Sequence, residues 1–239
     1  MRPYEIVCSI DDRAVWLEAR RHLVGASDKL NNSTLKKKIS PSEESGNKYT
    51  FIGSMLEEPI RRMFSVWTGM RSRRGRHLIR SKQYPFIGAT VDGVCRMPTT
   101  ERGVDKMRRH LVNDMGLDEW EAEEMIRYKN LSVLEIKAPV GRKLPLWAET
   151  ETSQYYLTKK PYEKFIKRGE YPPRDYYQQV QQQLLVTGMD VAWLVALVGG
   201  EHIISYRIES NKEAQRKRIL QCEQFWAKVE RARKNVNNG

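Results

Sequence analysis

The stretch Leu131-Ser-Val-Leu-Glu-Ile-Lys137 is the part of this sequence that most limits the fold. Successive residues of a β-strand point to opposite faces, so Glu135 and Lys137 share one face while Leu134 and Ile136 share the other. The pattern predicts a strand whose apolar face packs on a core. An acid and a base two residues apart on an amphipathic strand usually form a solvated face, so this pair alone identifies no site.

An aspartate earlier in the chain changes that interpretation. The segment Tyr84 to Cys95 is strand-like, and Asp92-Gly93 within it predicts a sharp turn. A hairpin with residues 131–137 would bring the Asp92 carboxylate beside Glu135, and two close carboxylates repel unless a cation lies between them. Oxygen ligands suit Mg²⁺ or Mn²⁺. We expect two ions, one to lower the pKa of a bound water and one to stabilise the leaving oxygen of a phosphodiester.

Three further side chains fit the same chemistry. Lys137 would orient the water and the scissile phosphate. Glu57, on a helix expected over Phe51 to Thr68, is the candidate for an extra metal ligand, with Glu58 as the alternative. Gln179 comes from a glutamine-rich helix, and its uncharged amide can hold Lys137 or a base without competing for metal. A glutamine run is also common on solvated faces, and the sequence leaves both interpretations open.

The remaining sequence predicts one domain over 1–239 with an α/β fold, a mixed central sheet flanked by helices. The expected order is helix, helix, β-hairpin, helix, strand, strand, helix. Other expected features are a helix over 13–22 with Asp11 and Asp12 where its N-cap belongs, a second helix capped within 26–28, a mobile loop over 31–48, a helical insertion over 97–130 with a capping box of Asp118 and Glu121, and a basic C-terminal helix and tail over 210–239.

Net charge points to the class of partner. Lys and Arg total 42 against 30 Asp and Glu, a formal net charge of +12. This balance favours a polyanionic partner over a small neutral substrate, although it does not choose among DNA, RNA and acidic lipid. The same charge could simply keep the protein in solution.

The cysteines and the hydropathy pattern indicate the compartment. Cys8, Cys95 and Cys222 are far apart and in none of the paired spacings that bind zinc, which favours a reducing compartment. Residues 1–10 lack the pattern of a signal peptide, and no apolar run approaches the length that crosses a bilayer. We therefore expect a soluble intracellular protein.

Six short motifs occur in a fixed order from residue 16 to residue 188. In this order they resemble the YqaJ-like viral recombinase family, typified by phage lambda exonuclease and built on the PD-(D/E)xK nuclease fold. The motifs are Trp16-Leu-Glu-Ala-Arg20, Gly25-Ala-Ser27, Gly53-Ser-Met-Leu-Glu57, Ala89-Thr-Val-Asp92-Gly93, Leu134-Glu-Ile-Lys137, and Gln179-Val-Gln181 followed by Val186-Thr187-Gly188.

The resemblance implies a phage or viral enzyme that uses metal to degrade one strand of linear duplex DNA from the 5′ end. Its partners would be DNA ends, a single-strand-annealing protein, and further copies of itself in a trimeric ring. By resemblance, the metal ligands would be Asp92, Glu135, Ile136 and Glu57, the catalytic lysine Lys137 with Gln179 as its supporting amide, and the 5′-phosphate pocket Arg20, Ser27 and Thr90.

Two departures from the family pattern affect the expectations. The interval between Asp92 and Glu135 is longer than the family's usual short hairpin, so the insertion would alter access to the DNA end or the oligomer. Val91 stands where the family usually has proline, and a β-strand accepts valine. Two other functions stay open: a structure-specific or nicking endonuclease on the same core, and a DNA-binding module without catalysis.

Overall fold

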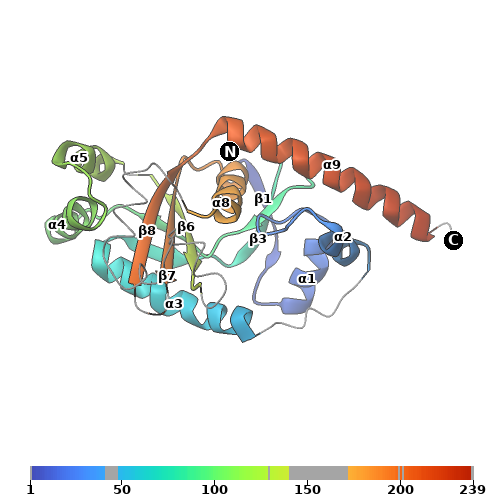
Figure 1. Cartoon of the computed structure of the whole chain (residues 1–239), viewed down its shortest axis with the longest axis horizontal. Coiled ribbons are helices and arrows are strands. Elements are labelled where there is room, and N and C mark those ends of the chain that lie inside the picture. The colour runs from blue at the N-terminus through green and yellow to red at the C-terminus, as the bar shows by residue number, and fades with distance from the viewer. Residues whose placement is uncertain are drawn as a thin grey trace, which may run out of the picture.

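The computed structural model describes residues 2–40, 48–128, 130–139, 172–198, 200 and 202–237 (Figure 1). Its strands are β1 (Tyr4–Ser9), β2 (Arg71–Arg74), β3 (His77–Ser81), β4 (Gly88–Thr90), β5 (Gly93–Arg96), β6 (Ser132–Lys137), β7 (Val191–Val198) and β8 (His202–Glu209). Its helices are α1 (Arg13–Arg21), α2 (Asn32–Ile39), α3 (Lys48–Thr68), α4 (Glu101–Arg109), the π-helix η1 (His110–Asp114), α5 (Glu119–Arg127), α8 (Arg174–Thr187) and α9 (Lys212–Asn237).

The described strands form two sheets. The larger sheet has the order β2-β5-β6-β7-β8, and the smaller has the order β1-β3-β4. Only the β6–β7 pair is parallel; the other pairs are antiparallel. Parallel neighbours need a crossover connection, and α8 lies in the chain between β6 and β7. The register places Glu135 opposite Leu194 and Lys137 opposite Ala196.

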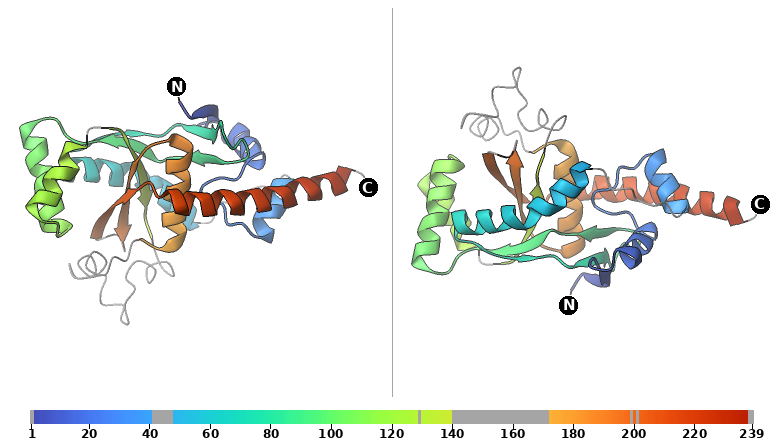
Figure 2. Two further views of the ribbon diagram at one scale, coloured as in Figure 1. Left: turned by 90° about the horizontal axis from the view of Figure 1, so that it is seen from above. Right: turned by 90° about the horizontal axis from the view of Figure 1, so that it is seen from below.

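Apolar side chains on the two faces of β7 explain the layering. Trp193 faces α3, where it packs with Ile60 and Phe64 in one buried cluster. Leu194, one residue on, points to the other face and packs with Val180 of α8. The sheet therefore lies between α3 and α8, and α9 crosses α8 on the outside (Figures 1 and 2).

Several expectations are confirmed. The fold is the expected mixed α/β sheet flanked by helices. Asp12 caps α1 by accepting from Val15 N, and Asp118 and Glu121 form the predicted capping box of α5. Strands β5 and β6 pair as an antiparallel hairpin around the insertion α4, η1 and α5.

None of the helices in the described ranges is long and apolar enough to cross a membrane.

The prediction of a mobile loop over 31–48 is wrong for its first part, whereas 41–47 lie outside the described residues. Asn31 accepts from Thr34 N and caps α2, so the second helix begins there and not within 26–28. The charged run Lys36 to Lys38 is typical of an exposed loop, but Lys38 is only 4% exposed in the structure. Its ammonium pairs with the buried carboxylate of Asp28 at 2.6 Å.

The predicted order of elements omitted β1, β2 and β3. Strand β2 has the sequence Arg-Ser-Arg-Arg and forms the edge of its sheet, where charged side chains face solvent and the apolar alternation of a strand is absent. The strand-like segment 84–95 is also divided, because β4 and β5 belong to different sheets and the chain passes between them at Val91 and Asp92.

Candidate active site

Asp92 lies at the break between β4 and β5, where the chain leaves one sheet for the other. Its Oδ2 accepts a hydrogen bond from the backbone N of Ile136 at 2.7 Å, and its backbone O accepts from Gly75 N at 2.9 Å. Gly75 is required there, since a Cβ would stand 1.9 Å from the carbonyl oxygen of Val91. The sequence expectation that a hairpin brings Asp92 beside the Glu135 strand agrees with this geometry.

Glu135 is a buried carboxylate held by three side chains. It is only 1% exposed, although it occupies the face of β6 that an amphipathic pattern would leave to solvent. Its Oε1 accepts from Lys137 Nζ and from Gln179 Nε2, and its Oε2 accepts from Gln183 Nε2 at 2.6 Å. The predicted set of Glu135, Lys137 and Gln179 is thus in direct contact, and the amide binds the acid, not the lysine.

Electrostatic effects show how closely the charged groups lie. Burial, and then the charges of Glu135 and Glu57, raise the pKa of Asp92 well above its usual value. Burial would lower the pKa of Lys137, but Glu135 and Asp92 outweigh it and raise that pKa above the usual value. The contact with Glu135 therefore favours the protonated form of Lys137.

Of the two adjacent glutamates on α3, only Glu57 is directed at this cluster. Burial, and then the charge of Glu135, raise the pKa of Glu57. Glu58 instead pairs with Arg61 at 2.5 Å and with Arg62 at 2.7 Å. The geometry therefore favours Glu57 over Glu58 as the third acid.

The donor set fits a hard divalent cation. Asp92, Glu57 and Glu135 repel one another, and a cation among them would relieve that repulsion. Ile136 N points toward Asp92, and its carbonyl points to the same side of an extended strand, which suits a backbone ligand. Within the described ranges no three His, Cys, Asp or Glu side chains are placed so that they could hold a metal ion together, and Lys137 Nζ lies against Glu135.

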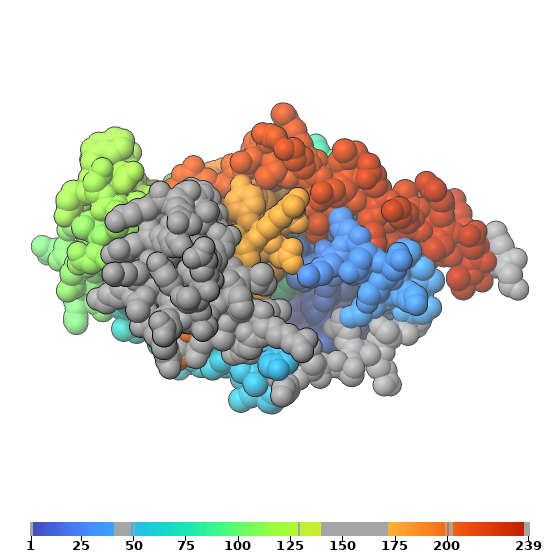
Figure 3. Space-filling model, in the orientation of Figure 1, coloured from blue at the N-terminus to red at the C-terminus, as the bar shows by residue number. Residues whose placement is uncertain are grey.

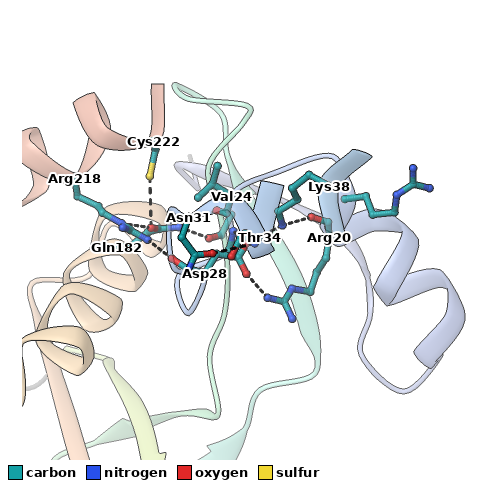
Figure 4. Close-up of polar contacts among 12 residues, drawn as sticks. Arg20, Val24, Asp28, Asn31, Thr34, Lys38, Gln182, Arg218 and Cys222 are labelled. Atoms are coloured by element: carbon teal, nitrogen blue, oxygen red, sulfur yellow. Dashed lines mark hydrogen bonds and ion pairs between the residues drawn. The ribbon is translucent and has the colours of Figure 1, made fainter. Parts of the chain in front are cut away.

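The predicted phosphate-pocket residues are only partly brought together. Arg20 and Ser27 both line a cavity of about 530 Å³ beside α1 and α2. Arg20 Nη2 donates to Asp28 Oδ1 at 2.5 Å (Figure 4). The Arg20 guanidinium also lies 4.7 Å from the centroid of the Trp16 ring. Thr90 is not part of that lining; its hydroxyl lies 3.5 Å from Trp16 Nε1.

A second cavity, of about 1080 Å³, extends from the catalytic candidates toward the C-terminal helix. Lys137 and Gln179 line it on one side, and Gln221, Gln224 and Lys228 of α9 line it on the other. In the space-filling view, α8 is visible in the recess between α9 and the segment leading into α2 (Figure 3). Ser27 lines both cavities, so the two lie next to each other.

Sequence reasoning missed three residues of this region. Gln183 was findable, because it follows Gln179 by four residues and shares its helix face. Tyr176, whose ring centroid lies 5.4 Å from Lys137 Nζ, precedes Val180 by four residues, so its spacing is that of an apolar helix face and gives no separate signal. Asp28 had no signal, because nothing in a short polar segment tells that its carboxylate is buried and bound by Arg20 and Lys38.

These features define an α/β protein with an acidic, lysine-containing site on the central strand of a mixed sheet. Residues 15–190 match the family described as the YqaJ-like viral recombinase domain, and the chain belongs to that family. The Bacillus subtilis (strain 168) protein YqaJ, described as uncharacterized, is 30% identical over 125 residues. The match covers 47% of this chain and only 38% of that relative.

Solved structures show the same fold. An alkaline exonuclease (LHK-Exo) from Laribacter hongkongensis superposes with a TM-score of 0.59 at 18% identity, covering 93% of this chain and 95% of that chain. A second structure of LHK-Exo, in complex with dAMP, gives the same values. At this identity the likeness establishes the fold and leaves the activity to be argued from the site.

Proposed function

We propose that this protein is a divalent-metal-dependent exonuclease that hydrolyses linear duplex DNA from the 5′ end during recombination or replication. The observation that carries the proposal is the junction of Asp92, Glu135 and Lys137, in which two acids and a lysine meet at the central strand β6. Membership of the YqaJ-like viral recombinase family supports it. The same proposal includes a phage or viral origin, a single-strand-annealing partner and a trimeric assembly.

Asp92, Glu135, Glu57 and the Ile136 carbonyl would hold Mg²⁺ or Mn²⁺, as one or two ions. When bound, the metal supplies positive charge that activates water and neutralises the phosphodiester. Gln179 and Gln183 fix the Glu135 carboxylate from α8, so its oxygens are oriented before any ligand arrives.

Lys137 would bind a nonbridging oxygen of the scissile phosphate. The neighbouring carboxylates raise its pKa and so favour the charged form that a phosphate would contact. A fixed cation stabilises the negative charge that develops on the phosphoryl oxygens during displacement.

Arg20 and Ser27 would receive the terminal 5′ phosphate, with Thr90 beside them. Asp28 engages Nη2 of Arg20, and no described residue accepts from its Nε or Nη1, which leaves two donors of the guanidinium for an anion. Trp16 supports the guanidinium plane from one side. This arrangement suits a phosphate monoester, which offers several acceptor oxygens at once.

The test is cleavage of 5′-phosphorylated linear duplex and of closed circular duplex, each with Mg²⁺ and with excess chelator. We expect loss of the linear duplex from its 5′ ends, no attack on the circle, and no activity with chelator. Nicking of the circle would establish the endonuclease alternative. Metal-dependent binding without any cleavage would instead favour a non-catalytic DNA-binding module.

A further inference from the structure

Helix α9 carries an exposed face that none of the proposed catalytic roles uses. The helix has eight Lys and Arg residues against three Glu residues over its 26 residues. Its apolar side packs inward through Cys222, Phe225 and Val229, all 5% exposed or less. The side that lines the 1080 Å³ cavity presents Gln221, Gln224 and Lys228.

That face continues past the cavity and contains no acid between Gln221 and Arg231. Arg231 follows Lys228 by three residues and is exposed, so it extends the same row outward by one turn. Glu223 and Glu230 lie five and two residues from Lys228, which at about 100° per residue places both on the opposite half of the helix. Neither Lys228 nor Arg231 forms an ion pair within the described part of the chain.

A buried polar network fixes the face relative to the catalytic candidates. Arg218 donates from Nε to Gln182 Oε1 at 2.8 Å and from Nη2 to the carbonyl of Asp28 at 3.1 Å (Figure 4). Gln182 is on α8, the helix that also carries Gln179. Helix α9 is therefore held in place before DNA binds, and its row of side chains starts at the cavity that contains Lys137.

The chemistry of the row matches a phosphate backbone. Amide and cationic side chains donate to phosphate oxygens without regard to base sequence. Unpaired bases are instead bound on exposed aromatic rings, and the aromatic side chain in this part of the cavity, Phe225, is only 5% exposed. Figure 1 shows α9 running straight from α8 past α2, as a backbone track requires.

We propose that the α9 face of Gln221, Gln224, Lys228 and Arg231 binds the phosphate backbone of duplex DNA leading to the end held at the candidate active site. The proposal rests on the proposed function and deepens it. From Gln221 to Arg231 the helix rises about 15 Å, at 1.5 Å per residue. With one phosphate per 3.4 Å along each strand, that length corresponds to roughly four base pairs.

The experiment is equilibrium binding of fluorescent 5′-phosphorylated duplexes in excess chelator, so that cleavage cannot interfere. The test variant is Lys228→Gln with Arg231→Gln. The matched control is Lys212→Gln with Arg216→Gln, which removes two exposed cations near the start of the same helix, 120° or more around its axis from Lys228. All four positions are exposed, so each variant should fold like the wild type.

We expect the test variant to weaken binding of a duplex of about twenty base pairs by roughly 2- to 30-fold. Its slope of log affinity against log salt should become less negative by about 1.8, or 0.9 for each lost phosphate contact. The control variant should change the affinity and the salt slope by less than half as much as the test variant does. A hairpin with a stem of only about four base pairs, held by its end at the candidate active site, leaves no further duplex to lie along α9, so the test variant should bind it nearly as the wild type does.

Equal losses in test and control variants would overturn the proposal, as would a loss independent of duplex length or one seen equally with single strands. Failure of this proposal can be distinguished from failure of the proposed function. If wild-type protein fails to cleave linear duplex with Mg²⁺ while the length-dependent loss persists, the nuclease assignment fails and the DNA-binding face stands.

Discussion

Lys137 combines a fixed positive charge with a position against Glu135 and near Asp92. Lys137→Ala should lower the single-turnover cleavage rate by roughly 10²- to 10³-fold, because a preorganised cation for the phosphate is lost. It also leaves the carboxylates uncompensated, so the melting temperature without metal should fall and Mg²⁺ should restore most of it. Rate and melting temperature with and without Mg²⁺ test both effects.

The control for Lys137 is Arg127→Ala, which removes an exposed ion pair with Glu124 on α5. An exposed pair contributes about 0–1 kcal/mol, so neither rate nor melting temperature should change appreciably. Near-normal cleavage by Lys137→Ala would remove the lysine from the proposed site.

Arg20 provides a second prediction at the scale of one residue. A charge-assisted hydrogen bond contributes about 1.5–3 kcal/mol, so Arg20→Ala should cost roughly 10- to 150-fold on 5′-phosphorylated duplex. The same variant should cost much less on 5′-hydroxyl duplex. The measurement is kcat/KM for wild type and variant on both ends.

Because Arg20 also neutralises buried Asp28, its removal can disturb folding. Arg20→Lys guards against that, since lysine keeps the charge beside Asp28 and loses the planar fork that binds phosphate. It should show an intermediate loss, again confined to the 5′-phosphorylated substrate. An identical loss on both substrates for both variants would exclude the phosphate pocket.

At the scale of elements, the π-helix η1 ties the insertion to the sheet through one histidine. His110 is 1% exposed, with Nδ1 3.1 Å from Asp114 Oδ2 and Nε2 2.8 Å from Ser205 Oγ on β8. Its ring also lies 4.1 Å, centroid to centroid, from that of Trp67 on α3. The insertion is thus anchored to two elements of the main body.

The pH dependence of this anchor has a definite sign. Burial lowers the pKa of His110 below its ordinary value of 6.5, although Asp114 opposes the shift. The unfolded chain therefore takes up a proton before the folded chain does, so stability is lost as pH falls from about 6.5 toward the lowered pKa. His110→Gln should reduce this slope of unfolding free energy against pH by up to about 1.4 kcal/mol per pH unit.

Urea denaturation of wild type and variant between about pH 5 and 7 gives the two slopes. Ser205→Ala serves as the control, because it removes a partner of Nε2 and keeps the titrating ring. It should lower stability by a similar amount at each pH and leave the slope unchanged. Parallel wild-type and His110→Gln curves would contradict the prediction.

Elements with a clear local pattern could be predicted from the sequence, and those stabilised by tertiary contacts could not. The capping box of Asp118 and Glu121 and the strand over residues 131–137 depend on near neighbours, and both were predicted. Strand β2 depends on pairing with β5, and α2 depends on Lys38 reaching Asp28. Neither dependence leaves a local signal.

The candidate site divides in the same way. Asp92, Glu135 and Lys137 could be proposed because residue spacing and a hairpin bring their chemistry together. The burial of Glu135 could not, since it requires knowing that α8 covers the outer face of β6 with Gln179 and Gln183.

At the scale of the whole molecule, the net charge of +12 makes a prediction about affinity. Each phosphate that the protein neutralises releases a counterion, so log affinity for duplex DNA should fall linearly with log salt at a slope of roughly −0.9 per contact. Titrations of labelled duplex over about 50 to 200 mM salt measure the slope. A flat response would argue against nucleic acid as the partner.

The glutamine run of α8 has a consequence for how this sequence can vary in length. Gln181 bonds to the Glu209 carbonyl and Asn211 N. Gln182 bonds to two carbonyls in the region of the smaller sheet and to Arg218. Gln183 bonds to Thr90 and Glu135. The three consecutive glutamines therefore have three different sets of hydrogen-bond partners. Gaining or losing one glutamine would leave the composition almost unchanged, yet it would rotate the two ends of the helix by about 100° relative to each other. Such an indel should be far more damaging than a conservative replacement of any one of the three.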